Sequence, residues 1–119
     1  MKVMVVDDEA DVRMLFEQRF RREVRDGRIV FHFALSAAEA LDFLENHQEE
    51  VLILSDINMP GMSGLDLLKT VKEKQGHRKV FMITAYGNAE YYRQAVDYGC
   101  DDYLTKPIDF ELLKEKLFS

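Results

Sequence analysis

The sequence predicts an α/β domain in which a parallel β-sheet is covered by helices on both faces. Two observations lead to this fold class: the alternation of strand-like and helix-like segments, and the unbroken character of the apolar runs. Five short apolar runs alternate with five segments whose apolar residues follow helical spacing, which gives the order βαβαβαβαβα. Strict alternation of strands and helices favours parallel strands joined by right-handed helical crossovers.

The apolar runs are rich in valine and isoleucine and are mostly unbroken. An unbroken run is typical of a strand that is buried on both faces, as in a parallel sheet. The predicted strands are Val3–Val6, Ile29–Ala34, Val51–Leu54, Val80–Ile83 and the weaker Asp102–Thr105.

The segments between the runs have apolar residues three or four positions apart, which predicts an amphipathic helix in each. In the first segment Val12, Phe16 and Phe20 recur every fourth residue, and Leu15 and Val24 fall on the same side. The later segments contribute Ala37, Leu41 and Leu44; Leu68 and Val71; Tyr92 and Val96; and Leu113 and Leu117. Each set predicts one helix.

Polar residues and glycines mark where these helices begin and end. Ser36 with Glu39 forms a capping box, and Ser63 with Asp66 resembles a second one. The other predicted N-caps are Asn88 and Asp109, the predicted helix ends are Gly76 and Gly99, and Asp26-Gly27 marks the turn into the second strand. Glycine suits a helix end because it takes the left-handed conformation at little cost.

Composition restricts the classes of protein. A chain of 119 residues and 13.9 kDa fits one domain, residues 1–119, which either stands alone or precedes an output domain. The single cysteine, Cys100, excludes an intrachain disulfide scaffold, and no apolar run approaches the roughly 20 residues of a membrane helix. The net charge of -6, without a long basic stripe, argues against direct nucleic-acid binding. We therefore expect a cytoplasmic protein with no membrane partner.

One segment is locally basic. Arg19–Arg25 contains four arginines interleaved with Phe20 and Val24. It is interpreted as a solvated helix face, with contact to a kinase partner or a neighbouring domain as the alternative.

Polar side chains follow most of the predicted strands. In an open parallel sheet, ligands bind at the carboxyl ends of the strands. The side chains expected there are Asp7 and Asp8 after the first strand, Asp56 after the third, Thr84 after the fourth and Lys106 after the fifth. Two like charges ~4 Å apart repel by ~4 kcal/mol at an effective dielectric of ~20, so three such carboxylates need a counter-ion. With Lys106 the formal charge of the group is -2, which one divalent cation neutralises.

An all-oxygen, carboxylate-rich site suits Mg²⁺, which keeps several waters and accepts a phosphate ligand. The backbone carbonyl of Asn58 is a further candidate ligand because it lies two residues beyond Asp56. Asp56 is the candidate nucleophile for a phosphoryl group, since it ends the central run alone, whereas Asp7 and Asp8 form a platform for the metal.

Several motifs occur in a recognisable order along the whole chain. They are Val5-Val6-Asp7-Asp8-Glu9, Ser55-Asp56-Ile57-Asn58-Met59-Pro60-Gly61-Met62-Ser63-Gly64, Thr84-Ala85-Tyr86 and Lys106-Pro107. With these motifs the chain resembles the response-regulator receiver domains of two-component signal transduction, in the manner of the chemotaxis regulators. The resemblance implies a doubly wound, flavodoxin-like sheet with strand order 2-1-3-4-5 and five helices.

The resemblance also implies how the acidic residues act. Asp56 would accept a phosphoryl group from a phosphohistidine on a sensor histidine kinase or phosphotransfer protein. Asp8 and Asp56 would ligate Mg²⁺ directly, Asp7 mainly through water, and Asn58 through its backbone carbonyl. The same resemblance favours a cis peptide bond at Lys106–Pro107.

Further roles follow from the family pattern. Thr84 and Lys106 would bind the phosphoryl oxygens, and Tyr103 falls at the position of a switch aromatic that turns inward as the threonine moves. Asn58 and Tyr86 occupy the positions that tune the rate of dephosphorylation. The chain is therefore expected to catalyse only its own phosphotransfer and dephosphorylation and not to be a metabolic enzyme.

Phosphorylation would act by shifting a population between two existing arrangements. The surface expected to change covers residues 88–118, that is, the fourth predicted helix, the fifth strand and the fifth helix. An output domain or a downstream protein would respond to it, and a phosphorylation-dependent dimer is compatible with the resemblance.

Three other functions compete with this interpretation. A flavin-binding protein of similar fold would need a small, hydroxyl-rich phosphate loop after the first strand, where this chain has two acids. A metal-dependent phosphatase usually carries a second acid two residues after its nucleophile, and here that residue is Asn58. A docking module without phosphorylation would lack some of the matched residues, and none is missing.

Overall fold

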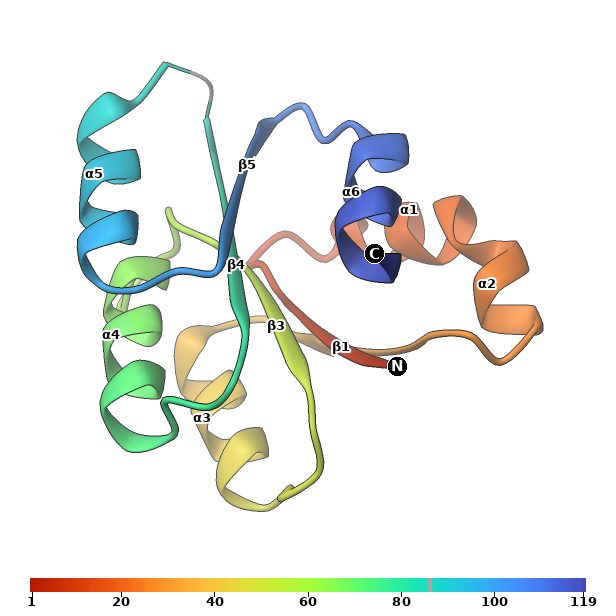
Figure 1. Cartoon of the computed structure of the whole chain (residues 1–119), viewed down its shortest axis with the longest axis horizontal. Helices are drawn as coiled ribbons and strands as arrows, with labels where there is room; N and C mark the ends of the chain where they lie inside the picture. Colours follow the sequence, from red (N-terminus) through yellow and green to blue (C-terminus); the bar gives the residue numbers. More distant parts are fainter. Residues whose placement is uncertain (86) are drawn as a thin grey trace.

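The computed structural model describes residues 1–85 and 87–119, which form a five-stranded sheet between two layers of helices (Figure 1). The strands are β1 (Lys2–Val6), β2 (Val30–Ala34), β3 (Leu52–Asp56), β4 (Val80–Ala85) and β5 (Asp102–Lys106). The helices are α1 (Asp11–Arg19), α2 (Arg21–Arg25), α3 (Ala37–Glu45), α4 (Gly64–Lys74), α5 (Ala89–Asp97) and α6 (Phe110–Phe118). In the described part of the chain, no helix has the length and apolar character needed to cross a membrane.

All neighbouring strands are parallel, and their order is β2-β1-β3-β4-β5, as the resemblance implied. The register pairs Val6 of β1 with Ser55 of β3, and Asp56 of β3 with Ile83 of β4. The carboxyl ends of these three strands therefore lie at one edge of the sheet. Residues just beyond those ends are brought together although they are far apart in sequence.

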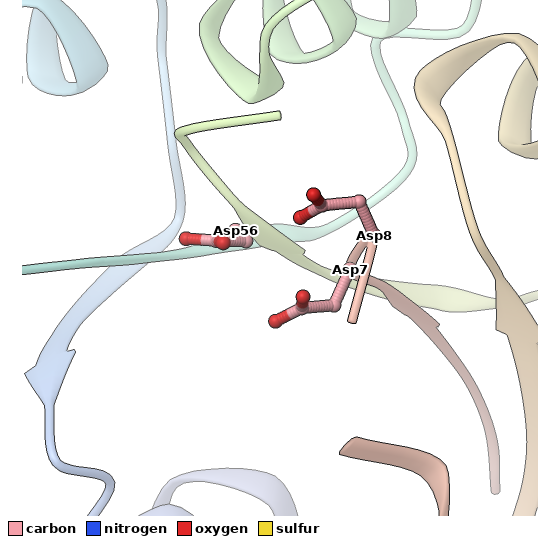
Figure 2. A group of neighbouring side chains, drawn as sticks. All are labelled: Asp7, Asp8 and Asp56. Carbon is pink, nitrogen blue, oxygen red and sulfur yellow. The ribbon is translucent and has the colours of Figure 1, made fainter. Parts of the chain in front are cut away.

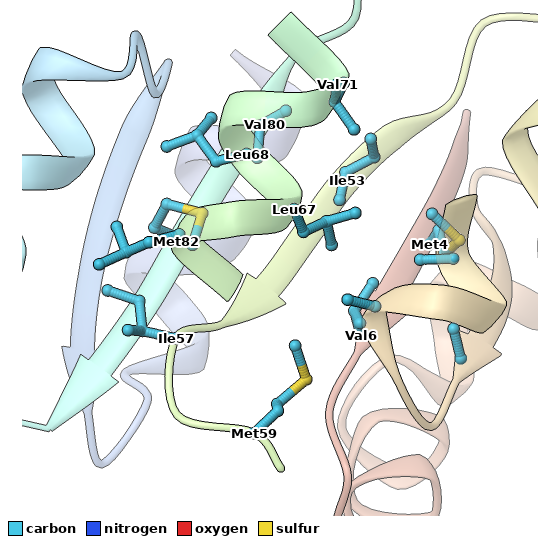
Figure 3. Close-up of a cluster of buried hydrophobic side chains, with 14 of the residues drawn as sticks. Met4, Val6, Ile53, Ile57, Met59, Leu67, Leu68, Val71, Val80 and Met82 are labelled. Atoms are coloured by element: carbon cyan, nitrogen blue, oxygen red, sulfur yellow. The ribbon is translucent and has the colours of Figure 1, made fainter. Parts of the chain in front are cut away.

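Each face of the sheet has its own apolar core. Helices α3, α4 and α5 cover one face, where Leu67 and Leu68 of α4 pack in the same cluster as Ile53 of β3 (Figure 3). Helices α1 and α6 cover the other face, and the rings of Phe16 and Phe110 meet edge to face at 5.3 Å between centroids. Full burial of each such side chain contributes about 1.5–3 kcal/mol, so the two cores hold the sheet as a rigid platform.

The strands and the helix starts agree with the sequence predictions. Every predicted strand is present, with bounds that differ by at most two residues. The four predicted N-cap side chains, Ser36, Ser63, Asn88 and Asp109, each accept a hydrogen bond from a backbone amide in the first turn. Gly99 ends α5 with φ 89°, and the amide of Cys100 donates to the carbonyl of Ala95 as in a Schellman ending.

The first helical segment differs from its prediction. It breaks at Phe20 (φ -108°, ψ 20°), so the chain has six helices in its described part instead of five. Leu15 and Val24 are exposed, and Phe20 and Glu23 are buried. The break shifts the phase of the helix after Phe20, so a periodicity counted through to residue 24 no longer identifies the buried face there. Leu15, before the break, lies at the edge of the face defined by Phe16.

Two further helices form where they were predicted but differ in detail. Tyr92 and Val96 are about half exposed, and α5 instead turns the small Ala95 toward the sheet. Their spacing defines one face of the helix but not which face packs. Helix α4 ends at Lys74, two residues before the predicted end at Gly76. Gly76 does not adopt the left-handed conformation, because the C-cap Gln75 is already non-helical.

Strand β2 is less buried than an unbroken apolar run suggests. Val30 and His32 are exposed, whereas Phe31 and Phe33 are half-buried. The difference arises because β2 is an outer strand, so solvent reaches part of it. The run predicted the strand correctly but not its place in the sheet.

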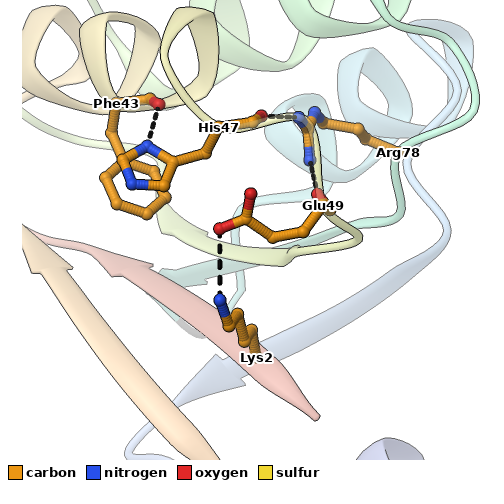
Figure 4. Close-up of polar contacts among 5 residues, drawn as sticks. All are labelled: Lys2, Phe43, His47, Glu49 and Arg78. Carbon is orange, nitrogen blue, oxygen red and sulfur yellow. Dashed lines mark hydrogen bonds and ion pairs between the residues drawn. The ribbon is translucent and has the colours of Figure 1, made fainter.

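A buried arginine stabilises the end of the molecule where β4 begins. Arg78 is 4% exposed, and its guanidinium donates to the carbonyl oxygens of Glu49 (3.0 Å) and His47 (2.7 Å) (Figure 4). Glu49 also accepts a hydrogen bond from Lys2 of β1 at 3.1 Å. These contacts tie the loop after α3 to the beginnings of two strands.

Candidate functional site

Three carboxylates meet at the carboxyl ends of β1 and β3. Figure 2 shows the side chains of Asp7, Asp8 and Asp56 extending toward a common space. One oxygen from each lies within 4.8 Å of the others. Asp7 and Asp56 are 8% and 6% exposed, whereas Asp8 is open to solvent. The predicted gathering of these acids at one edge of the sheet is confirmed.

Backbone contacts hold the two buried acids in place. The amide of Asp7 donates to the carbonyl of Ala34 in β2 (3.1 Å), and Asp7 Oδ1 accepts from the amide of Glu9 (2.9 Å). Asp56 is the last residue of β3, and the amide of Ile57 after it donates to the carbonyl of Ile83 (3.0 Å). Both carboxylates therefore project from backbone that is fixed by neighbouring strands.

Gly64 is a positioning residue that the sequence reasoning missed. A Cβ atom at this position would lie 1.9 Å from the carbonyl oxygen of Asp56 and 2.9 Å from the Cα of Ile57. The amide of Gly64 also donates to the carbonyl of Ile57 at 2.8 Å. The first turn of α4 thus rests directly on the backbone of Asp56. A glycine just after an N-capping serine was the available signal.

Lys106 completes the group from the end of β5. Its Nζ lies 3.1 Å from Asp56 Oδ2 and 3.8 Å from Asp7 Oδ2. The peptide bond between Lys106 and Pro107 is cis, as the resemblance implied. The ammonium group therefore approaches both buried acids, with the shorter contact to Asp56.

The electrostatics follow from this crowding. Burial raises the pKa of Asp7 above its ordinary value, and the charge of Asp56 raises it further against the opposing effect of the Glu9 amide. Burial lowers the pKa of Lys106, but the hydrogen bond to Asp56 and the charges of both acids outweigh it and leave this pKa raised. Lys106 thus stays charged at neutral pH, and one ammonium cannot balance three carboxylates.

Thr84 lies in β4 beside this group and is completely buried. Its Oγ1 has no hydrogen-bond partner among the described residues. Burial raises the pKa of the Tyr103 hydroxyl, and the neighbouring Thr84 side chain opposes part of that rise, although the pair does not reach hydrogen-bond geometry. The half-buried ring of Tyr103 contacts the exposed Tyr92 edge to face at 4.9 Å.

The remaining predicted site residues are less constrained. Asn58 is exposed in the loop that follows β3. Tyr86 lies outside the described residues. Both therefore remain predictions from the resemblance.

The donor set fits a hard divalent cation. Three carboxylate oxygens that converge within 4.8 Å are the ligand type that Mg²⁺ prefers, and the exposed Asp8 leaves a side open to water. The group also contains a buried acid, Asp7, whose pKa is raised by burial and by the charge of Asp56. The cluster could therefore bind a metal ion.

Residues 3–118 match the family model for the response regulator receiver domain. The chain belongs to this family. Receiver domains are regulatory switches of two-component systems, and they accept phosphoryl groups from histidine kinases. The match includes every residue of the five strands except Lys2, and every residue of the acidic cluster.

Related proteins agree with the assignment. The response regulator protein PilR of Pseudomonas aeruginosa is 38% identical over 114 residues, which is 96% of this chain and 24% of PilR. A chemotaxis protein CheY homolog of Campylobacter jejuni is 31% identical over 119 residues, and the alignment covers 98% of this chain and 89% of that homolog. The receiver domain therefore spans about a quarter of some relatives and most of others.

Solved structures give the same fold. A CheY-like response regulator receiver domain protein from Methanospirillum hungatei superposes with a TM-score of 0.85 at 28% sequence identity. The alignment covers 98% of this chain and 90% of that one. The doubly wound arrangement is thus shared with experimentally determined receiver domains.

Proposed function

We propose that this receiver domain is switched by phosphorylation of Asp56. The donor is a phosphohistidine on a sensor histidine kinase or a phosphotransfer protein. A carboxylate oxygen of Asp56 forms a bond to phosphorus while the histidine N–P bond breaks, and the imidazole leaves with the electron pair of that bond. The observation that supports this assignment is the convergence of Asp7, Asp8 and Lys106 around Asp56.

The acids that surround Asp56 suit the binding of Mg²⁺. Asp8 and Asp56 would hold it directly, Asp7 mainly through water, and the backbone carbonyl of Asn58 would complete the protein ligands. When bound, the ion offsets the negative charge that gathers on the phosphoryl oxygens. Asp7 and Asp8 would thereby allow a further anionic group to approach the carboxylate of Asp56.

Lys106 and Thr84 would recognise the phosphoryl group. Lys106 Nζ already lies 3.1 Å from Asp56 Oδ2, so it can donate to a phosphoryl oxygen after a small movement. The buried hydroxyl of Thr84 has no partner among the residues that the structure describes, so a new acceptor nearby would satisfy it. Both contacts would favour one of two arrangements of the loops around β4 and β5.

Tyr103 would carry the change to the surface formed by α5, β5 and α6. Its ring packs on the exposed Tyr92 and its hydroxyl lies near the Thr84 side chain, so a movement of Thr84 would alter how the two tyrosines pack. An output domain or a downstream protein would read this surface, and the phosphorylated form would dimerise if that surface also pairs with itself. Asn58 and Tyr86 would set how fast water removes the phosphoryl group.

The same proposal covers the setting of the domain. Residues 1–119 would act as one receiver unit in the cytoplasm, without direct contact to nucleic acid or membrane. A flavin-binding function is not favoured, because two acids follow β1 where a phosphate loop would be needed.

Incubation with acetyl phosphate and Mg²⁺ tests the function. Intact-mass spectrometry should show one added phosphoryl group on the wild type, none without Mg²⁺ and none on Asp56→Ala. Asp97→Asn, which alters an exposed acid on α5, should be modified like the wild type. A folded wild type that neither acetyl phosphate nor a matched histidine kinase modifies would refute the proposal.

A further inference from the structure

A second polar site lies where α1, α2 and α6 meet. A cavity of about 450 Å³ is lined there by Arg19, Arg21, Arg22, Arg25, Glu23 and Lys114. We call it the basic cavity. It shares no residue with the acidic cluster around Asp56.

The break at Phe20 creates the basic cavity. The backbone leaves helical geometry at this residue, which directs the ring of Phe20 into the core and lets Glu23 become buried one turn later. Lys114 of α6 lies 5.1 Å from the centroid of the Phe20 ring and 3.1 Å from Glu23 Oε2. Lys114 thus connects α6 to the break and to α2, and basic side chains line the cavity between them.

Three of the four arginines in the basic cavity form no ion pair with a residue that the structure describes. Arg21 and Arg22 are exposed and form no ion pair with any described residue. Arg19 lies over the ring of Phe110 at 5.3 Å, which orients its guanidinium without neutralising it. Only Arg25 has a nearby carboxylate in the described chain, Asp26 at 3.5 Å.

The charge of the basic cavity opposes that of the rest of the molecule. Five basic side chains and one carboxylate give the lining a formal charge of +4, whereas the whole chain carries -6. The remainder of the chain must therefore carry -10. A cationic surface so concentrated on an acidic protein is unfavourable for the free protein and favourable for binding an anion.

Glu23 supplies an independent observation. It is 8% exposed, and its Oε1 has no hydrogen-bond partner within the described residues. Glu23 and Lys114 both line the cavity, and Lys114 pairs with Oε2 of Glu23 but leaves Oε1 without a donor. A ligand with an acidic O–H group, or a water bound with it, would supply that donor.

We propose that the basic cavity binds a small anion that carries at least two phosphate groups. Guanidinium groups pair with phosphate through two parallel hydrogen bonds, and several are available on adjacent turns. Each phosphate group carries about -1.5 to -2 at neutral pH, so two of them match a lining charge of +4. A volume of about 450 Å³ suits a small molecule.

An extended polyanion fits less well. Beyond the basic cavity the protein is strongly acidic, and charges within a Debye length of ~8 Å at physiological salt would repel a nucleic acid or an acidic protein surface. A ligand confined to the cavity feels mainly its basic walls. The concave shape therefore favours a small polyphosphate over an acidic peptide.

Calorimetric titration with sodium pyrophosphate in Mg²⁺-free buffer tests this proposal. The wild type should bind one pyrophosphate per chain, and amide NMR signals should shift in α1, α2 and α6 but not around Asp56. The double variant Arg21→Gln, Arg22→Gln should bind at least about tenfold more weakly, because charged hydrogen bonds are lost. Arg93→Gln, which alters an exposed arginine paired with Glu90 on α5, should bind like the wild type.

Three outcomes would overturn the proposal. The first is the absence of saturable binding to the wild type, and the second is equal affinity in the double variant. The third is equal binding of a hepta-glutamate peptide, which would make this surface a docking site for acidic protein segments. None of these measurements depends on phosphorylation, so they succeed or fail independently of the function proposed for Asp56.

Discussion

Thr84 of β4 and Thr105 of β5 are partners in the register of the sheet, yet only one of them is buried. Thr84 is completely inaccessible and its hydroxyl has no partner among the described residues, whereas Thr105 is exposed to solvent. A buried hydroxyl without a partner costs about 1–3 kcal/mol. Such a cost is consistent with a hydroxyl that becomes useful only when a phosphoryl group is present.

Replacing Thr84 with valine should therefore separate stability from signalling. Thr84→Val removes the unpaired hydroxyl at nearly constant volume, and we expect the unfolding free energy to rise by about 1 kcal/mol. The phosphorylated variant should lose most of the NMR shift changes in α5, β5 and α6. Urea unfolding and amide spectra measure the two effects. Thr105→Val is the matched control, and a variant of Thr84 that is both less stable and fully responsive would contradict this role.

The ammonium group of Lys106 should be needed for the response rather than for metal binding. Lys106→Ala removes the 3.1 Å contact with Asp56 but leaves all three carboxylates in place. We expect the variant to bind Mg²⁺ and to accept a phosphoryl group from acetyl phosphate. After phosphorylation, the amide signals of Lys106→Ala over residues 88–118 should stay close to those of the unphosphorylated protein. The control variant Lys79→Ala should show the same shift changes as the phosphorylated wild type. A normal response in Lys106→Ala would remove this residue from the mechanism.

Gly64 should be intolerant of any side chain. The Cβ of Gly64→Ala would lie 1.9 Å from the carbonyl oxygen of Asp56, so α4 must move away from β3. We expect a loss of about 3 kcal/mol or more in unfolding free energy, because the atoms of Asp56 and Ile57 that the new Cβ would meet belong to the backbone and cannot rotate away. Gly76→Ala, near the other end of α4, has its closest contact at 3.0 Å and should change stability far less. Denaturant unfolding distinguishes them, and equal stability of the two variants would contradict the close approach.

The raised pKa of Asp7 predicts a pH-dependent penalty in the metal-free protein. Folded Asp7 keeps its proton to a higher pH than the unfolded chain does, so stability falls as pH rises from its ordinary pKa through its raised folded-state pKa. Asp7→Asn removes this penalty. In EDTA, the variant should be more stable than the wild type at pH 7, and the difference should shrink toward pH 4.

Mg²⁺ should stabilise the wild type more than Asp7→Asn, opposite to the difference expected in EDTA. Mg²⁺ at ten times its Kd stabilises a folded protein by about 1.4 kcal/mol, so the Tm of the wild type should rise with Mg²⁺ while that of Asp7→Asn rises little. Asp97→Asn serves as the control because it alters an exposed acid on α5. Equal Mg²⁺-induced rises in Tm for the wild type and Asp7→Asn would show that Asp7 takes no part in the metal site.

The sequence predicted the sheet and the gathering of acids because both depend on local patterns. Apolar runs identify strands, and a parallel sheet places the carboxyl ends of its strands at one edge. The strand order 2-1-3-4-5, which the family resemblance implied, then makes β1 and β3 neighbours. Asp7, Asp8 and Asp56 therefore meet at the edge where the sequence places them. The N-caps were equally accessible, since a serine or aspartate binds amides in its own first turn.

Features that depend on tertiary packing could not be read in this way. The break at Phe20 accompanies the packing of its ring against Phe110 of α6, a contact that helical spacing does not encode. The exposure of Tyr92 and Val96 depends on which face of α5 meets the sheet. The approach of Gly64 to Asp56 depends on how α4 docks, although the glycine itself is visible in the sequence.

The most direct test of the account is to locate the phosphoryl group chemically. Sodium borohydride reduces an acyl phosphate to an alcohol, so a phosphorylated aspartate becomes homoserine and can be found by peptide mass spectrometry. The account predicts homoserine at position 56 and at no other acid. Homoserine at Asp7 or Asp8 instead, or its absence from protein that carries the added phosphoryl mass, would contradict the assignment of Asp56 as the acceptor.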